Sequence, residues 1–218
     1  MTAHVEVTIH ALAAGGDGVG KDPDGRTVFV AAAAPGDRVS VRVTERHARW
    51  ARGELVRLDA PGPGRIAPAC PKFAARTCGG CDWAHVDLAT QRAQKHAIVA
   101  GQVRRLVAAG ATLAPLACPE DDWGWRRRAR FAVVGGAVGF HAPRSHRVTD
   151  VDACSQLTPA LAAALAPLGL PDARVVAVAW PFACVDPRVR LPSASLEIRA
   201  LAAALTDDAA AAPLSPGA

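Results

Sequence analysis

Hydrophobic and polar residues alternate in short runs through residues 1–62 of the chain. The alternation is clearest over residues 5–9 and 39–43, where every second residue is valine or isoleucine. Two further strand-like runs, at residues 27–30 and 51–58, are set apart by turns rich in Gly, Pro and Asp. A period of two places one face of each strand in a core. Short strands divided by such turns predict a small antiparallel β-barrel.

The hydrophobic period changes after residues 61–64, whose Pro-Gly-Pro-Gly sequence predicts a linker. Apolar residues recur at steps of three and four over residues 88–107, and Gly110 follows them. This pattern predicts an amphipathic helix with its stop. The Gly-Gly pair at 135–136 predicts a hairpin turn between two strands. Thr158, followed by proline, predicts the N-cap of a short helix.

The composition indicates a folded protein with a sizeable core. Half of the 218 residues are apolar, and the net charge of +5 permits a nucleic-acid partner without requiring one. The first residues lack the basic start and apolar centre of a signal peptide. No apolar run reaches the ~18 residues expected of a membrane span. We therefore expect a cytoplasmic protein without a membrane partner.

Three of the six cysteines, Cys70, Cys78 and Cys81, lie in one short glycine-rich segment. Because these three cysteines are close in the sequence, bringing them together around one metal centre costs little loop-closure entropy. Thiolates are the ligands of iron–sulfur clusters and of structural zinc, and either centre needs a fourth ligand. Cys154 is the best candidate for that ligand, and Cys118 is its main rival. Disulfides are the weaker interpretation because no secretory signal is present.

A second candidate site is the densest basic and aromatic cluster of the chain, with four Arg and two Trp in residues 123–131. Arginine suits the geometry of phosphate, and aromatic rings stack on bases. In a strand, Arg126, Arg128 and Arg130 would share one face, and Trp125 would lie on the other. These four residues are therefore predicted to bind RNA. The structural alternative pairs the arginines with acids and places the tryptophans in the core.

The first part of the chain resembles a TRAM domain, an oligonucleotide-binding-like barrel that precedes some RNA-modifying enzymes. The matching residues, which lead directly into the cysteine segment, are Ile9 through the turn at 15–20, and residues 28–30, 35–39 and 53–55. Their order and spacing carry the resemblance. It implies a barrel that binds RNA, and the alternative is a small barrel with only a packing role.

The next part of the chain resembles the RNA (uracil-5-)-methyltransferases. The resemblance begins at Arg65 and includes the Cys-Gly-Gly-Cys pair, His85 and the arginine-rich strand, in the family's order. It implies a 4Fe-4S cluster held by Cys70, Cys78, Cys81 and Cys154. It also implies S-adenosylmethionine as methyl donor and rRNA or tRNA as partner. The seven residues between the first two cysteines are more than is usual in the family.

The chemistry of this family is methylation of uracil C5, carried out by a C-terminal α/β domain that binds S-adenosylmethionine. Only 48 residues follow Leu170, and they contain no strand, glycine-rich loop and helix in succession. Such a domain needs on the order of 150 residues. We therefore expect neither a Rossmann-like S-adenosylmethionine-binding domain nor a catalytic residue in this chain.

The predicted fold class is mixed β and α+β. An OB-like TRAM barrel over residues 1–62 precedes an iron–sulfur α+β domain over 63–170, and residues 171–218 form a poorly specified remnant with a disordered tail. The predicted function is the RNA-binding and iron–sulfur part of an RNA (uracil-5-)-methyltransferase, truncated and inactive alone. The alternatives are a non-catalytic RNA-binding iron–sulfur module and a zinc-stapled structural protein. The sequence indicates neither the target uridine nor whether a partner supplies the methyltransferase domain.

Overall fold

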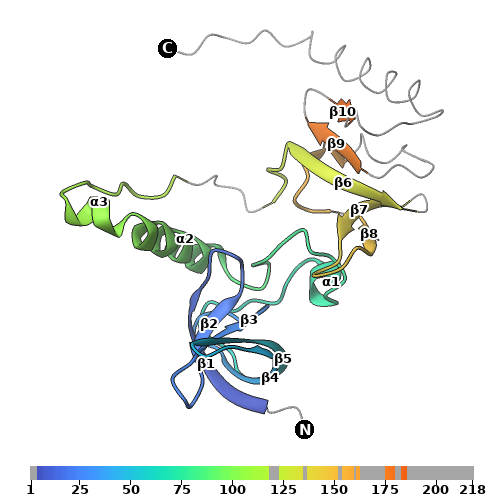
Figure 1. Cartoon of the computed structure of the whole chain (residues 1–218). Helices are drawn as coiled ribbons and strands as arrows, with labels where there is room; N and C mark the ends of the chain where they lie inside the picture. Colours follow the sequence, from blue (N-terminus) through green and yellow to red (C-terminus); the bar gives the residue numbers. More distant parts are fainter. Residues whose placement is uncertain are drawn as a thin grey trace. The chain divides into compact units, whose positions relative to one another are not determined.

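The computed structural model consists of two compact units (Figure 1). The structure describes residues 4–117, 123–134, 137–151, 154–159, 161–162, 175–179 and 183–185. The first unit joins residues 1–69 to 81–118, and the second joins residues 70–80 to 119–218. Most of the cysteine segment therefore belongs to the C-terminal unit, and the helical region belongs to the barrel. The expected boundaries, after residues 62 and 170, divide the chain differently.

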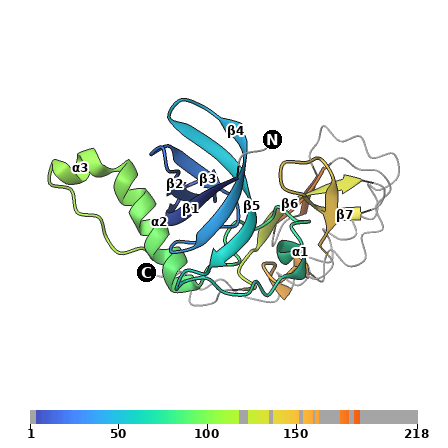
Figure 2. The ribbon, with the colours of Figure 1, turned by 90° about the horizontal axis from the view of Figure 1, so that it is seen from below.

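Five strands of the first unit close into a barrel. They are β1 (His4–Leu12), β2 (Gly18–Lys21), β3 (Thr27–Val30), β4 (Arg38–Arg46) and β5 (Trp50–Ala60). Their order around the barrel is β1-β2-β3-β5-β4, and β4 pairs with β1 to complete it. Only β3 and β5 run parallel; the other neighbours are antiparallel. Figure 2 shows β4 and β5 as one long hairpin. The closed five-stranded barrel confirms the predicted OB-like architecture.

The interior of the barrel is filled by the aliphatic residues of the alternating runs. The buried cluster consists of Val7, Ile9, Val28, Val30, Ala33, Val39, Val41 and Ala51. Each valine or isoleucine contributes roughly 1.5–3 kcal/mol by leaving water. The backbone of β5 packs directly on this core, because a Cβ at Gly53 would lie 2.2 Å from Cγ1 of Val41. Every second residue of these strands is apolar, and burial of these side chains inside the barrel stabilises it.

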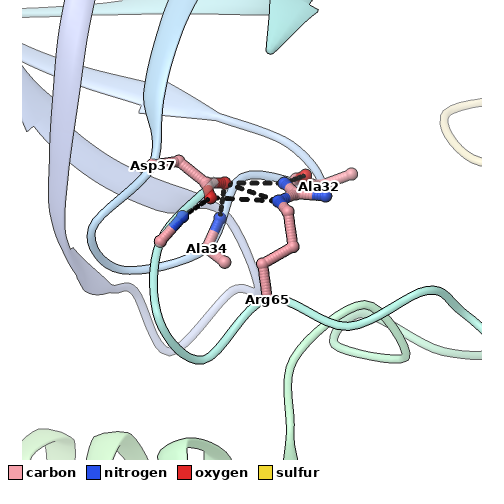
Figure 3. A network of polar contacts seen from close by, with 5 residues as sticks. Ala32, Ala34, Asp37 and Arg65 are labelled. Atoms are coloured by element: carbon pink, nitrogen blue, oxygen red, sulfur yellow. Dashed lines mark hydrogen bonds and ion pairs between the residues drawn. The ribbon is translucent and has the colours of Figure 1, made fainter. Parts of the chain in front are cut away.

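A buried ion pair fastens the segment after the barrel to the turn between β3 and β4 (Figure 3). Asp37 is fully buried, and its carboxylate accepts hydrogen bonds from the backbone N–H groups of Ala34 at 2.6 Å and Gly62 at 2.8 Å. The Arg65 guanidinium donates to the same carboxylate, at 2.6 Å from Nη2, and to the carbonyl of Ala32 at 2.7 Å. The predicted linker is therefore clamped to the barrel at its end.

The balance of these contacts sets the charge state of Asp37. Burial alone raises the pKa of the carboxyl group, but the hydrogen bonds from Arg65, Ala34 and Gly62 outweigh it and hold the pKa below its ordinary value. Hydrogen bonds to the charged form of a carboxyl group favour that form. Asp37 is therefore an ionised, fully paired group inside the first unit.

The predicted helix is confirmed as two segments, α2 (Leu88–Gln102) and α3 (Arg104–Ala108), with a break at Val103. The Asp87 side chain caps α2 by accepting from the backbone N–H of Thr90 at 2.7 Å. The backbone N–H of Leu12 donates to Oε1 of Gln94 at 2.8 Å, which ties α2 to β1. Gly110 has a φ of 97°, as expected of a helix stop. Within the described part of the chain, no helix combines the length and apolar character needed to cross a membrane.

The second unit contains a five-stranded antiparallel sheet and a short helix. Its elements are α1 (Pro71–Ala74), β6 (Arg128–Val134), β7 (Ala137–His141), β8 (Val148–Asp150), β9 (Val175–Ala179) and β10 (Ala183–Val185). The strand order is β10-β9-β6-β7-β8. Val134 pairs with Ala137, which confirms the predicted hairpin.

Strand β9 corrects the sequence analysis, which assigned no strand to residues 171–218. Residues 175–179 pair antiparallel with residues 128–132 of β6 and so cover the edge of β6 that β7 leaves open. An uncovered edge strand exposes unpaired N–H and C=O groups, so pairing with this apolar run is favourable. The disordered tail expected at the end of this remnant lies outside the described residues.

Candidate metal centre and nucleic-acid surface

The cysteine segment 70–80 lies against the β7–β8 hairpin. The backbone N–H of Gly79 donates to the carbonyl of His141 at 2.9 Å. The Thr149 hydroxyl donates to the carbonyl of Thr77, and the Lys72 ammonium donates to the carbonyl of Asp150. Three hydrogen bonds along the segment thus hold it on the two strands that lead to Cys154.

The two glycines between Cys78 and Cys81 allow the backbone to approach β7 closely. A Cβ at Gly79 would lie 2.8 Å from the carbonyl oxygen of His141, and one at Gly80 would lie 2.8 Å from the ring of Phe140. Neither glycine is among those with a positive φ. Both glycines therefore serve the close packing of this loop on β7.

We expect Gly79→Ala to destabilise the protein by about 1–3 kcal/mol, because the new methyl group overlaps backbone that cannot move easily. Gly15→Ala is the matched control, since a Cβ at Gly15 has nothing within 4 Å. Chemical denaturation of both variants measures the difference. Equal stabilities for the two variants would contradict the close packing of the loop on β7.

Cys154 interacts electrostatically with Cys78 of the second unit. It follows β8 at the start of a turn, where its backbone N–H donates to the carbonyl of Val151 at 3.2 Å. Burial raises the pKa of the Cys78 thiol, and electrostatic interactions with Cys154 and Cys70 raise it further. Like charges disfavour a second ionised thiol nearby. The fold therefore brings Cys154 into electrostatic range of Cys78, although 75 residues separate them in the sequence.

The chemistry of these thiols fits a centre that binds thiolates. Cys70, Cys78, Cys81 and Cys154 are all half-buried and form no disulfide. The backbone N–H of Gly80 donates to Sγ of Cys78 at 3.4 Å, and Lys72 also favours the thiolate of Cys78. Such hydrogen bonds to sulfur are typical of iron–sulfur sites. In the described residues, no three Cys, His, Asp or Glu side chains converge as a site for one metal ion.

The side chains of the other two cysteines lie outside what the structure describes. Cys118 lies outside the described residues, and only the backbone of Cys184 is described, in β10. Cys81 is the first residue of the second stretch of the first unit, residues 81–118.

The arginine-rich segment is arranged differently from a single continuous strand. Strand β6 begins at Arg128, and Arg128 and Arg130 are both exposed. Arg126 lies before the strand and forms an isolated bridge with Leu157. Its guanidinium lies 5.3 Å from the ring centre of Trp125 and 5.7 Å from that of Phe140. Arg126 is therefore packed on rings, while the other two arginines present their charge to solvent.

Trp125 is 48% exposed, so the alternative that places both tryptophans in the core does not hold for it. An aromatic ring that stays in water beside exposed arginines is available to stack on a base. A second group of this kind, which was not predicted from the sequence, lies on the barrel. It contains Phe29, His47, Trp50 and Arg52, whose rings and guanidinium contact one another. The sequence pattern could have indicated this group, because Phe29 of β3 and Trp50 of β5 stand next to buried residues in alternating strands and so lie on the outer face.

Comparison with known proteins finds similarity over most of the chain. The family model of the TRAM domain matches residues 3–56. The 23S rRNA (uracil(1939)-C(5))-methyltransferase RlmD of Halomonas elongata is 40% identical over 172 residues, which cover 75% of this chain and 34% of that protein. The protein of the same name from Shewanella baltica is 33% identical, over 77% of this chain and 38% of that protein. The chain thus spans about a third of the length of these relatives.

A solved structure has a similar fold. It is that of Pyrococcus abyssi tRNA (uracil-54, C5)-methyltransferase in complex with S-adenosyl-L-homocysteine, with a TM-score of 0.51 and 19% sequence identity. The match covers 79% of this chain and 42% of that one. At this identity the likeness extends to the fold alone.

Proposed function

Given that this chain belongs, over three quarters of its length, to the RNA (uracil-5-)-methyltransferase family, we propose that it supplies RNA binding and an iron–sulfur centre to the methylation of uracil C5. The observation that carries this proposal is the succession of a TRAM barrel, a thiol-rich loop and an arginine-rich strand within one homologous stretch. The RNA is ribosomal or transfer RNA, as the names of the relatives suggest. Such a partner implies a cytoplasmic location.

RNA binding is assigned to exposed cationic and aromatic side chains of both units. In the second unit these are Trp125, Arg128 and Arg130, with Arg126 half-buried beside them. Arginine donates to phosphate oxygens in a fork, and an exposed indole stacks on an unpaired base. Arg126 has a mixed role, because its guanidinium also packs on Phe140.

The iron–sulfur centre is assigned to Cys70, Cys78, Cys81 and Cys154. Its support is the electrostatic interaction of Cys78 with Cys70 and Cys154, together with the all-thiol donor set. A 4Fe-4S cluster, when bound, would cross-link the cysteine loop to the segment after β8. The metal binding energy would then stabilise the folded second unit.

The matched residues cover about a third of the relatives' length. We propose methyl transfer, with S-adenosylmethionine as donor, for a protein of the relatives' full length. Incubation of the purified chain with labelled S-adenosylmethionine and ribosomal or transfer RNA tests whether this stretch acts alone. We expect RNA binding without formation of 5-methyluridine, because this chain shows no sequence signal of a binding loop for the donor.

We expect binding of structured RNA to weaken steeply as salt rises, through release of counterions. Replacing Arg128 and Arg130 by Ala should flatten the slope of log K against log salt, by roughly 0.7–0.9 for each phosphate that is no longer neutralised. Arg126→Ala is measured separately, since its side chain also packs on rings. The matched control replaces Arg42 and Arg57, whose guanidinium groups are paired with Glu54 and Asp59. A slope that falls equally in the control would reject the assignment to β6.

A further inference from the structure

We propose that an unpaired stretch of RNA crosses the outer face of the barrel beside the turn between β4 and β5. In this site a base stacks against the paired rings of His47 and Trp50, and phosphates lie against Arg52 and its cationic neighbours. The inference rests on the proposed function and adds the form of RNA that the barrel recognises, with the residues that recognise it.

The strand pattern places these side chains on the outside of the barrel. Val28 and Ala51 are fully buried in the core. Their neighbours Phe29, Trp50 and Arg52 therefore point away from it, since side chains alternate along a strand. Phe29 pairs directly with Arg52 across the parallel β3–β5 ladder. The two strands thus carry one continuous outer surface of aromatic and cationic groups.

The rings are already arranged as a stacking platform. The rings of His47 and Trp50 are stacked, with centroids 3.9 Å apart and planes at 22°. Phe29 meets Trp50 edge-on, with centroids 6.2 Å apart. The Arg52 guanidinium lies 5.9 Å from the ring centre of Phe29 and 6.0 Å from that of Trp50. The side chain of His47 is 47% exposed, so a base can extend the stack on its open side.

The charge around the rings favours an anionic ligand. Three exposed cations surround the rings: Lys21 at the end of β2, Arg46 at the end of β4 and Arg49 in the turn between β4 and β5. Two carboxylates also lie here, and both have partners: Asp17 is 3.7 Å from Arg52, and Glu45 contacts His47 at 2.7 Å. The Arg52–Asp17 contact is long and leaves the Arg52 side chain 44% exposed, so a phosphate can compete for Arg52.

The geometry favours unpaired RNA over a duplex. Bases of an A-form helix are stacked inside it and are not available to an outer ring, whereas unpaired bases stack freely on aromatic side chains. OB-like barrels bind oligonucleotides on the face of strands 2 and 3 and on the loop between strands 4 and 5. The present cluster lies on β3, β5 and that loop, at the edge of this face.

The test measures binding of the full chain to a labelled, unstructured RNA of about 12 nucleotides, within the range of one OB-like barrel. Trp50→Ala should weaken binding about tenfold or more, and Trp50→Phe should retain most of it, because base–aromatic stacking tolerates any ring. Arg52→Ala should weaken binding, whereas Arg57→Ala, on the same strand but paired with Asp59, should not. A duplex of the same length should be much less sensitive to Trp50→Ala.

A second readout separates recognition from stability. RNA should quench tryptophan fluorescence in the wild type more than in Trp50→Phe, which a purely structural stack would not produce. Unchanged binding by folded Trp50→Ala and Arg52→Ala, with loss of binding in the β6 arginine variants, would overturn this site and leave the proposed function intact. Failure of the wild type to bind any RNA would instead overturn the proposed function and this site with it.

Discussion

Replacement of Cys154 by serine is expected to remove the proposed iron–sulfur cluster, whereas Cys118→Ser should leave it in place. Cys154 is the distant cysteine that interacts electrostatically with Cys78. A 4Fe-4S cluster needs a thiolate on each iron, and serine is a poor substitute for one of four. Iron content and visible absorbance after anaerobic purification measure the loss. Thermal stability should fall with it, because metal binding and folding of the second unit are coupled.

The Cys118→Ser variant also controls for the general effect of losing a thiol. Retention of iron by Cys154→Ser, together with its loss in Cys118→Ser, would overturn the ligand assignment. Cys70→Ser adds a further check, because the interval between Cys70 and Cys78 is longer than the family usually has. Its loss of iron should match that of Cys154→Ser.

Asp37→Asn is expected to destabilise the first unit by about 3 kcal/mol at neutral pH, because it leaves the largely buried Arg65 without its charged partner. Glu54→Gln is the matched control: its ion pair with Arg42 is half exposed on both sides, so its loss should matter little. Urea denaturation of the wild type and both variants gives the two differences. Equal effects of the two substitutions would contradict a buried role for Asp37.

The stabilisation that Asp37 provides should depend on pH in one direction. The pKa of Asp37 is lowered in the folded protein, so its stabilisation is fully present above the unfolded value of ~3.9. That stabilisation is lost as pH falls through the lower folded pKa. Asn does not titrate, so the difference between wild type and Asp37→Asn should shrink below about pH 4. A difference that grows on acidification would contradict the assignment.

The barrel was largely predictable because its signal is local. The apolar residues of the alternating runs 5–9 and 39–43 form much of the core of the barrel. The Gly and Pro turns fall between strands as expected. The parallel pairing of β3 with β5 was not predictable, since a period of two carries no information on strand order. The Asp37–Arg65 pair was not predictable either, because its partners lie 28 positions apart in the sequence and both lie in segments that predict turns.

The second unit was harder to predict because its strands depend on long-range pairing. Residues 175–179 are uniformly apolar and have no period, so only the open edge of β6 makes them a strand. The start of β6 was placed too early, since Arg126 bonds instead to the segment after Cys154, where its N–H donates to the carbonyl of Gln156. The four cysteines were chosen from spacing and resemblance, and their ligand role stays a prediction.

The iron, acid-labile sulfide and zinc content of the anaerobically purified chain decides between the iron–sulfur and zinc assignments of the four cysteines. Four thiolates around one cubane predict a brown protein with about four irons and about four sulfides per chain. Colourless protein with one stoichiometric zinc and no sulfide would contradict the iron–sulfur assignment, and the zinc-stapled alternative would take its place.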